Sequence, residues 1–430
     1  MIARYTLPGM ARVWSEQNKF DNMLKVEISA CEALAKLKII PKGDLFQIKK
    51  KARFQLDRIK KIEEKTNHDV LSFVMNISEN VGEAAKWVHF GLTSSDVVDT
   101  AFSLMMREAM DILIKDTSGL LRAFRIKARK YKNVVMIGRS HGVHAEPITF
   151  GLKMALFYQE TKRNLQRLKK ARETIAYGKI SGSVGTHANV DPFVEEYVCR
   201  KLGLKPAGVS SQILQRDRHA EYLDMIAITG SSLEKFATEF RGLQRTEIGE
   251  VEEYFSPTQK GSSSMPHKKN PIIAERICGL ARILRANAAA GMENMLLWHE
   301  RDISHSSVER VIVPDSAILL DYMLVRMTDL VNKLVVKEDR MRENLGRTKG
   351  IIFSQRVLLE LVKKGLTRIE AYDIVQEAAL NIQKENMHFK DALKTNKRVR
   401  NVMSPAAIEE CFDLGYHTKY IDKIFKKAEI

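Results

Sequence analysis

Hydrophobic residues recur at helical spacing along most of the chain. Leu24, Ile28, Cys31 and Ala35 fall at i, i+4, i+7 and i+11, and this segment ends before Pro41. Such spacing places the apolar side chains on one face of a helix. The N-terminal part of the chain is therefore expected to contain amphipathic helices that pack on one another.

Long stretches without proline extend this pattern over the rest of the sequence. Proline breaks helix interiors, so its absence favours helices of unusual length. Little strand-like alternation is evident, and we predict an all-α fold whose central bundle consists of long helices. The long helices are expected near residues 101–131, 152–177, 217–247, 272–300 and 314–343.

Breaks in the helical pattern suggest three helical domains. A Gly-Leu-Thr-Ser-Ser segment at 91–95 interrupts the first pattern, and shorter segments follow GRTKG at 346–350. We expect an N-terminal domain at 1–93, a central bundle at 94–345 and a C-terminal domain at 346–430. The central domain would carry a polar loop at 261–271.

Composition places the chain among cytoplasmic proteins. The 430 residues are 44% hydrophobic and 29% charged, and the four cysteines lie far apart without a CxxC pair, as is usual in a reducing compartment. The first residues carry charges and a Pro-Gly where a secretory signal needs an apolar run. No window has the length and hydrophobicity of a membrane span, so no membrane association is expected.

The formal net charge of +17 adds little to this assignment. Basic proteins bind nucleic acids, anionic surfaces or small anionic substrates. Here the lysines are spread along the whole chain, without a basic tail or an aromatic-basic module that would stack bases. We therefore expect no nucleic-acid partner, although a nucleic-acid-binding protein stays as an alternative.

Four polar segments interrupt the helical pattern and are the expected places for chemistry. They read KTNHDVLSF (65–73), HFGLTSSDVVDT (89–100), GRSHGVHAEPITFG (138–151) and GSSSMPHKKNP (261–271).

The last of these segments suggests an anion-binding corner. Asn270 suits a helix N-cap and Pro271 the first helical position. The free amides at such a helix start would face Ser262, Ser263 and Lys268. The glycine and serines before the helix would form a mobile segment that closes over a ligand.

Histidines in three of the breaks suggest acid-base chemistry assembled from distant segments. His141 lies in a turn-like or extended segment next to Gly142, His68 follows Asn67, and His89 precedes the Thr-Ser-Ser run. A His141-x-x-His144 pair without a third ligand is a weak metal signal. No phosphate-binding glycine loop is present, and we expect neither a metal nor a cofactor.

These segments carry a family resemblance. GSSSMPHKKNP is similar to the signature loop GSSxMPxKxNP of the fumarase/aspartase superfamily, whose members release fumarate by β-elimination. The N-terminal 34 residues, TSSDVVDT, RSHGVHAEPITFG and WHERDISHSSVER resemble the adenylosuccinate lyases within it. The resemblance covers essentially the whole chain.

The resemblance implies a homotetramer with a multi-helix core and active sites shared between subunits. The implied small-molecule substrates are adenylosuccinate, cleaved to AMP and fumarate, and succinylaminoimidazole carboxamide ribotide (SAICAR), cleaved to AICAR and fumarate. Both carry two carboxylates and a phosphate, which would explain basic residues in the pocket.

Catalytic roles follow from the same resemblance. Ser262 would be the base and His141 the acid, while Glu275 would orient His141 and support its charged form. Lys268 would supply positive charge near Ser262, and His68 would sit near the phosphate or the leaving nitrogen.

The resemblance also implies a set of substrate-binding residues drawn from every polar segment. Arg276 stands where some relatives carry Asn, so no substrate contact is assigned to it. The implied residues are Arg4, Tyr5, Asn67, His68, Asp69, His89, Thr93, Ser94, Gln212, Ser263, Lys268, Lys269, Asn270, Arg301, Ser306 and Arg310.

Two further alternatives remain beside the nucleic-acid binder. One is a lyase of the superfamily with a different amine leaving group. The other is a protein on the same scaffold that has lost catalysis and serves a binding or structural role.

Overall fold

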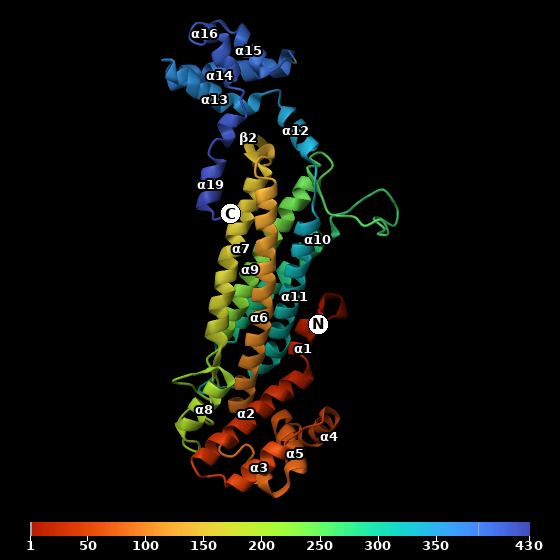
Figure 1. Ribbon diagram of the computed structural model, residues 1–430, viewed down its shortest axis with the longest axis vertical. Coiled ribbons are helices and arrows are strands. Elements are labelled where there is room, and N and C mark those ends of the chain that lie inside the picture. Colours follow the sequence, from red (N-terminus) through yellow and green to blue (C-terminus); the bar gives the residue numbers. More distant parts are fainter. Residues whose placement is uncertain (1, 386) are drawn as a thin grey trace. The chain divides into compact units, whose positions relative to one another are not determined.

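The computed structural model describes residues 2–385 and 387–430 (Figure 1). The chain forms two compact units that each draw on three separated stretches. Unit 1 consists of Met1–Gly119, Thr161–Lys235 and Arg276–Met327, and unit 2 of Leu120–Glu160, Phe236–Glu275 and Thr328–Ile430.

Helices that are mostly short, with the 21-residue α2 as the exception, form the N-terminal part of unit 1. Their apolar faces meet in one core, where the rings of Phe20 and Phe73 stack at 5.3 Å, and α8 packs against α2 in this core. The elements are η1 (Ala3–Tyr5), α1 (Pro8–Val13), α2 (Glu16–Lys36), α3 (Lys42–Lys51), α4 (Leu56–Thr66), α5 (Asp69–Val81), η2 (Gly82–Trp87) and α8 (Pro192–Leu202).

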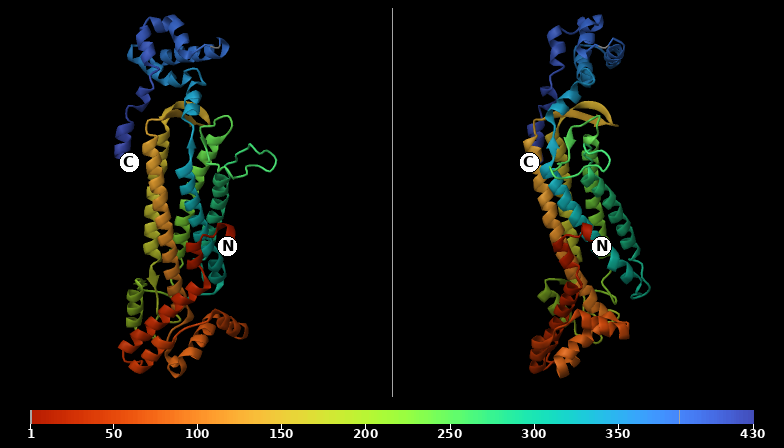
Figure 2. Two further views of the ribbon diagram at one scale, coloured as in Figure 1. Left: turned by 45° about the vertical axis from the view of Figure 1, so that its right-hand side comes forward. Right: turned by 90° about the vertical axis from the view of Figure 1, so that its right-hand side faces the viewer.

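Five long helices confirm the predicted helix-rich architecture. Residues of each helix belong to both units, and the unit 1 parts of α6, α7, α9 and α11 lie alongside one another in every view (Figures 1 and 2). The helices are α6 (Ser94–Lys130), α7 (Phe150–Ile175), α9 (Asp217–Gln244), α10 (Ile272–Glu293) and α11 (Ser304–Lys333). In unit 1, β3 (Tyr177–Gly178) also pairs in parallel with β4 (Lys205–Pro206).

Unit 2 contains a β-hairpin that the sequence pattern did not predict as strands. β1 (Val135–Ser140) pairs with antiparallel β2 (Val143–Thr149). Ile137 of the hairpin packs with Leu345, Ile352 and Phe353 in a small core. A second strand pair joins β5 (Val251–Glu252) to β6 (Val335–Val336), and the residues between β5 and α10 form a long loop (Figure 2).

The C-terminal stretch of unit 2 folds into short helices, as expected after residue 346. They enclose a core of their own, which includes Leu361, Ile374 and Phe389. The elements are α12 (Glu338–Gly346), η3 (Ile351–Phe353), α13 (Ser354–Lys363), α14 (Arg368–Glu385), α15 (Phe389–Thr395), α16 (Lys397–Arg400), α17 (Pro405–Glu410), α18 (Gly415–Thr418) and α19 (Ile421–Lys427).

The last two long helices differ from their expected bounds. α11 starts at Ser304, ten residues before Pro314, so this proline lies inside the helix rather than at its start. Proline cannot donate to the carbonyl of Arg310, and the surrounding helix tolerates the loss of one bond. α10 ends at Glu293, earlier than expected. The three-domain division stays a prediction, and its first boundary coincides with the start of α6 at Ser94.

Candidate active site

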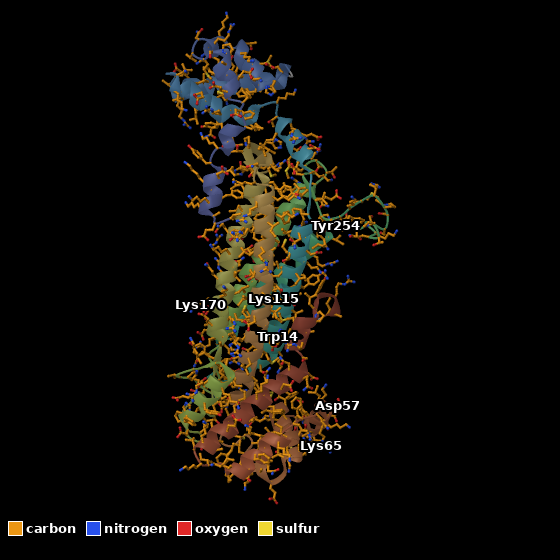
Figure 3. All side chains as sticks on the ribbon, in the orientation of Figure 1. Trp14, Asp57, Lys65, Lys115, Lys170 and Tyr254 are labelled. Atoms are coloured by element: carbon orange, nitrogen blue, oxygen red, sulfur yellow. The ribbon has the colours of Figure 1, made fainter. Side chains whose placement is uncertain are left out.

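One cavity in unit 1 gathers residues from distant parts of the chain. It encloses about 690 Å³ and lies between the starts of α2, α5, α6 and α11 and the loop before α9. Part of its wall is apolar, and Trp14, labelled in Figure 3, packs edge-on against Phe102 with ring centroids 5.9 Å apart. The predicted site residues that line it are Asn67, His68, Asp69, Thr93, Ser94, Gln212, Arg301, Ser306 and Arg310.

The junction of α4 and α5 presents three of these residues. Asn67 ends α4 in the left-handed conformation with φ of 49°, which asparagine tolerates better than most residues. His68 caps α5, and its Nδ1 accepts a hydrogen bond from the amide of Leu71 at 3.2 Å. Because Nδ1 is an acceptor here, the imidazole proton lies on Nε2. His68 is therefore held as the tautomer whose free nitrogen is a donor.

The start of α6 is held by the side chain of its third residue. Thr93 is the residue before the helix, and its amide donates to Oδ2 of Asp96 at 2.9 Å. This bond back to the residue before the helix stabilises the first turn. Thr93 and Ser94 are thereby fixed where the positive end of the helix dipole meets the cavity.

An ion pair connects the α5 and α11 sides of the cavity. Nη2 of Arg310 bonds to Oδ2 of Asp69 at 2.8 Å, and Nζ of Lys19 lies 3.7 Å from the same oxygen. Nε of Arg310 lies 3.4 Å from Oγ of Ser306, one helical turn earlier. Although burial opposes ionisation of Asp69, the charges of Lys19 and Arg310 hold its pKa below the usual value. Burial lowers the pKa of Lys19.

A buried charge cluster forms another part of the wall. The guanidinium of Arg216 binds Asp99 through two bonds of 2.7 and 3.1 Å, and Glu309 through two bonds of 2.8 and 3.1 Å. Burial raises the pKa of Glu309 to about 7, and the charge of Asp99 adds to this effect while Arg216 opposes it. Burial and the charge of Arg216 lower the pKa of His305 to about 4. Glu309 is thus a wall residue whose charge changes near neutral pH.

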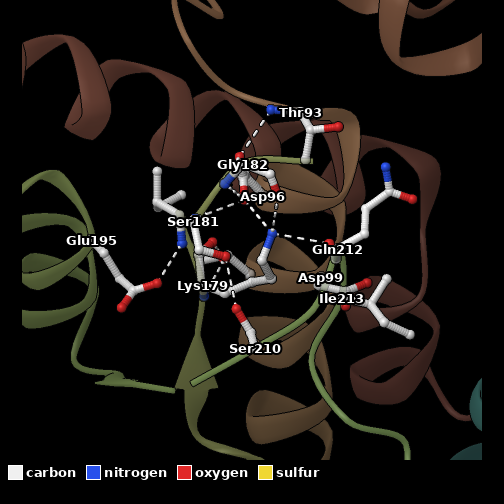
Figure 4. Close-up of polar contacts among 12 residues, drawn as sticks. Thr93, Asp96, Asp99, Lys179, Ser181, Gly182, Glu195, Ser210, Gln212 and Ile213 are labelled. Carbon is white, nitrogen blue, oxygen red and sulfur yellow. Dashed lines mark hydrogen bonds and ion pairs between the residues drawn. The ribbon is translucent and has the colours of Figure 1, made fainter. Parts of the chain in front are cut away.

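Behind Thr93 lies a second buried ion pair, between Lys179 and Asp96 (Figure 4). Both side chains are fully buried. Nζ of Lys179 also donates to the backbone oxygens of Gln212 at 2.9 Å and of Gly182 at 3.3 Å. The carboxylate of Asp96 accepts the amides of Ser181 and Gly182 in addition to that of Thr93.

Other predicted residues of unit 1 lie outside the cavity wall. His89 has a φ of 63°, and its Nδ1 lies 2.7 Å from Oε1 of the buried Glu27. Although burial disfavours a charged imidazole, the Glu27 carboxylate raises the pKa of His89 above its ordinary value. The ring of Tyr5 packs on that of Tyr322, whose hydroxyl accepts a hydrogen bond from Arg276 at 2.9 Å. Arg276 therefore supports Tyr5 indirectly, and Arg4 precedes Tyr5 in the same short 3-10 helix.

In unit 2, His141 occupies the tip of the β-hairpin. His141 and Gly142 connect the two strands with φ values of 54° and 78°. Two consecutive left-handed residues form the tight turn that matches the twist of a hairpin. The imidazole is thus carried on an exposed turn, in agreement with the turn-like segment expected there.

The signature loop of unit 2 directs two amides at Ser262. Oγ of Ser262 accepts from the amide of Met265 at 3.1 Å and from that of Ser264 at 3.3 Å. Donors in this arrangement stabilise negative charge on the oxygen. Lys269 forms an ion pair with Glu252 at 2.7 Å. Ser263, Lys268 and Asn270 share the same loop, which contains no helix or strand between residues 253 and 271.

The expected anion-binding corner at the start of α10 is wrong in one respect. The amides of Ile273 and Ala274 are not free, because they donate to the carboxylate of Glu253 at 3.2 and 2.8 Å. A negative side chain from a distant segment therefore already occupies the helix start. Glu275 lies in the first turn of this helix, and no bond between Glu275 and His141 is found among the described residues.

Several charged residues of the cavity wall were missed by the sequence interpretation. A usable signal was present, since Glu309 lies one helical turn from His305 in the quoted WHERDISHSSVER segment and Asp99 lies one turn from Asp96. The missed residues are Glu16, Lys19, Glu63, Asp99, Arg216, His305 and Glu309.

Across residues 2–385 and 387–430, no three His, Cys, Asp or Glu side chains are arranged to hold a metal ion. Within the same residues, no helix is both long and apolar enough to cross a membrane.

Comparison with known proteins agrees with the geometry. Residues 3–284 match the family described as Lyase, and residues 350–428 match that described as Adenylosuccinate lyase C-terminus. Adenylosuccinate lyase of Bacillus subtilis (strain 168) is 52% identical over 427 residues, which cover 99% of each protein.

Solved structures give the same fold. A fumarate lyase from Mesorhizobium sp. BNC1 is similar with a TM-score of 0.89 and 26% identity, covering 99% of both chains. The 3-carboxy-cis,cis-muconate lactonizing enzyme from Pseudomonas putida reaches a TM-score of 0.90 at 26% identity, covering 99% of this chain and 97% of its own. With the full-length sequence match, these findings show that the chain belongs to the adenylosuccinate lyase family of the fumarase/aspartase superfamily.

Proposed function

We propose that the chain cleaves adenylosuccinate to AMP and fumarate, and SAICAR to AICAR and fumarate. The observation that carries this proposal is the cavity of unit 1, where nine residues implied by the family resemblance line one space. The full-length identity to a protein named adenylosuccinate lyase supports the same substrate.

The balance of charged residues in the cavity wall supports an active site to which other segments add residues. The substrates carry two carboxylates and a phosphate, yet the wall has no excess of positive charge. Its cations are Lys19, Arg216, Arg301 and Arg310, and its acidic residues are Glu16, Glu63, Asp69, Asp99 and Glu309. Further cations must join when a substrate binds, and Lys268 of the signature loop and Arg4 suit this role.

The proposed reaction is a β-elimination. Ser262, as an alkoxide, takes a proton from the carbon next to a carboxylate of the succinyl group. The electron pair left on that carbon moves into the carboxylate and then forms the double bond of fumarate. The carbon–nitrogen bond breaks, its electrons stay on the nitrogen, and His141 donates the proton that neutralises it.

The local geometry of both residues supports these roles. Two loop amides point at Oγ of Ser262, where the negative charge of the base must reside. His141 stands on an exposed turn, from which an imidazole can reach a ligand. We assign His68 to the phosphate or the leaving nitrogen, because its Nε2–H donor belongs to the cavity wall.

We further propose a homotetramer whose active sites combine residues of several subunits. Apolar side chains are exposed near the end of α10 and the start of α11, including Leu296 at 85%, Trp298 at 78% and Ile303 at 65%. Large apolar side chains gathered on a surface are typical of a protein interface. The apolar face of a second copy would cover them.

The cysteines support a cytoplasmic enzyme. All four are free and buried, as expected in a reducing compartment.

The decisive experiment offers adenylosuccinate and argininosuccinate separately to the purified protein and measures fumarate. Fumarate from adenylosuccinate alone supports the proposal, and fumarate from argininosuccinate would favour a lyase with another amine leaving group. Ser262→Ala and His141→Ala should each abolish turnover while circular dichroism shows an intact fold. Wild-type activity in either variant would contradict the assigned roles.

A chelator separates this mechanism from one that depends on a metal. No proposed step uses a metal ion, so activity should persist after treatment with EDTA. A loss that zinc or magnesium restores would direct attention to His141 and His144.

A further inference from the structure

The buried pair of Lys179 and Asp96 has no role in the reaction described above. Neither residue lines the cavity, and both side chains are fully buried. Placing a lysine in the interior is costly unless a negative partner compensates it. The pair nevertheless bonds to the backbone of two cavity residues, Thr93 and Gln212, and can therefore influence a ligand in the cavity.

The first path runs through the start of α6. Asp96 is the third residue of this helix and holds the amide of Thr93. A carboxylate at this position would, if uncompensated, offset the positive end of the helix dipole. It would also repel an anion bound at Thr93 and Ser94. The ammonium of Lys179 cancels that charge from the interior side.

The second path runs through Gln212. The same ammonium donates to the backbone oxygen of Gln212 at 2.9 Å, so one cation connects this loop to the start of α6 (Figure 4). Asp96 in turn binds the amides of Ser181 and Gly182, which fixes the lysine segment itself. The side chain of Gln212 and those of Thr93 and Ser94 line one cavity from two different segments.

We propose that Lys179 and Asp96 are a positioning pair for the carboxylate end of the substrate. Lys179 sets the distance between Gln212 and the start of α6, and its charge allows a carboxylate to bind beside the Asp96 side chain. This inference rests on the proposed function, and it takes Thr93, Ser94 and Gln212, which line the cavity, as contacts of the succinyl group. It assigns no chemical step to either residue.

The test compares two probes that share no groups. Fumarate carries the carboxylates alone, and AMP carries the base and phosphate alone. In Lys179→Met, the inhibition constant of fumarate should rise on the order of tenfold or more, because an uncompensated carboxylate remains near the site. The affinity for AMP should change less than about twofold, because the pair bonds directly to Thr93 and Gln212 and reaches His89, a candidate phosphate residue, only through the charge of Asp96.

A double variant distinguishes the effect of the unpaired charge from a general disruption of the structure. Asp96→Asn combined with Lys179→Met is electrically neutral, and it should recover most of the lost fumarate affinity. Across these variants, the KM of adenylosuccinate should change in parallel with the inhibition constant of fumarate, and kcat should change less. Lys170→Met is the matched control, because this lysine is exposed on α7, and it should behave as wild type.

Clear results would overturn the inference. Equal weakening of AMP and fumarate in Lys179→Met would indicate a purely structural pair, as would a double variant no better than the single one. Should Lys179→Met not fold, the neutral double variant replaces it, and equal loss of both probes would again refute the proposal. If the wild type neither binds AMP nor releases fumarate, the proposed function itself fails instead.

Discussion

At the scale of single residues, Glu309 is a cavity residue whose carboxyl group gains or loses its charge near neutral pH. Burial raises its pKa to about 7, so the carboxyl is neutral below that pH and negative above it. An anionic ligand should therefore bind less tightly as pH rises through 7. Between pH 7 and 9, where the phosphate stays a dianion, the KM of adenylosuccinate should rise by up to about tenfold.

The variant Glu309→Gln isolates this effect. It preserves the shape of the side chain but cannot become negative, so the rise of KM with pH should be smaller than in wild type. Steady-state kinetics at fixed ionic strength would show the difference. Parallel pH profiles of the two proteins would mean that Glu309 keeps one charge state throughout.

His89 offers a second prediction at the residue scale. Because Glu27 raises its pKa, the imidazole keeps its positive charge to higher pH than an ordinary histidine and loses it as pH rises further. In Glu27→Gln, burial remains without the compensating carboxylate, so the charge should be lost at lower pH. If His89 contacts the phosphate, AMP affinity should decline at lower pH in this variant than in wild type.

Calorimetric titration of AMP between pH 6 and 8 measures that shift. His89→Ala should remove the part of the pH dependence that differs between the wild type and Glu27→Gln. Glu79→Gln serves as the control, because Glu79 is exposed and pairs with Arg58 away from the cavity wall. If the pH profile of AMP affinity were unchanged in Glu27→Gln, His89 would have no part in binding the phosphate.

At the scale of elements, the sequence predicts what depends on local spacing. The spacing of apolar residues and the length of the proline-free stretches were sufficient to predict the long helices. Two of the polar breaks, 65–73 and 89–100, contributed nine of the residues that line the cavity. The hairpin around His141 was not predicted because its strands lack a regular alternation of buried and exposed positions and contain Gly138 and Pro147. Pro314 was misread as a helix start because the tertiary packing that tolerates it is invisible in the sequence.

The partners of the site residues could not be predicted by the same reasoning. Arg310 and Asp69 are 241 positions apart, Lys179 and Asp96 are 83 apart, and His89 and Glu27 are 62 apart. These pairs depend on how elements pack, which periodicity does not encode. Glu253 is an example of a partner that was missed. Its carboxylate accepts the amides at the start of α10 that the local sequence had indicated to be free.

The signature loop provides a prediction for one element. A Cβ at Gly261 would lie 2.2 Å from the backbone oxygen of Lys268 and 3.3 Å from the ring of Phe255. In Gly261→Ala the loop must therefore open, which displaces Ser262 from its amide donors. We expect kcat to fall by at least about tenfold. The melting temperature should hardly change, because the loop is largely exposed.

Gly43→Ala is the matched control for this substitution. No atom lies within 4 Å of a Cβ built at Gly43, so activity and melting temperature should both stay near wild type. A Gly261→Ala enzyme with wild-type kcat would show that the loop tolerates displacement. The assignment of Ser262 as the base would then lose its geometric support.

At the scale of the whole molecule, the arrangement of active sites between subunits is open to a direct test. If the base Ser262 and the acid His141 of one site come from different subunits, inactive variants can complement each other. In an equal mixture of Ser262→Ala and His141→Ala subunits, half of the positions for each group carry the functional residue. Random reassembly would then restore about a quarter of wild-type activity.

The value of a quarter follows from the symmetry and needs no knowledge of rates. Mixing without subunit exchange should yield no activity, and light scattering should show one tetrameric species before and after exchange. Reassembled mixtures without activity would place both groups in one subunit. The acidic balance of the cavity would then have to be overcome by cations of that same chain, with Lys268 as the first candidate for substitution.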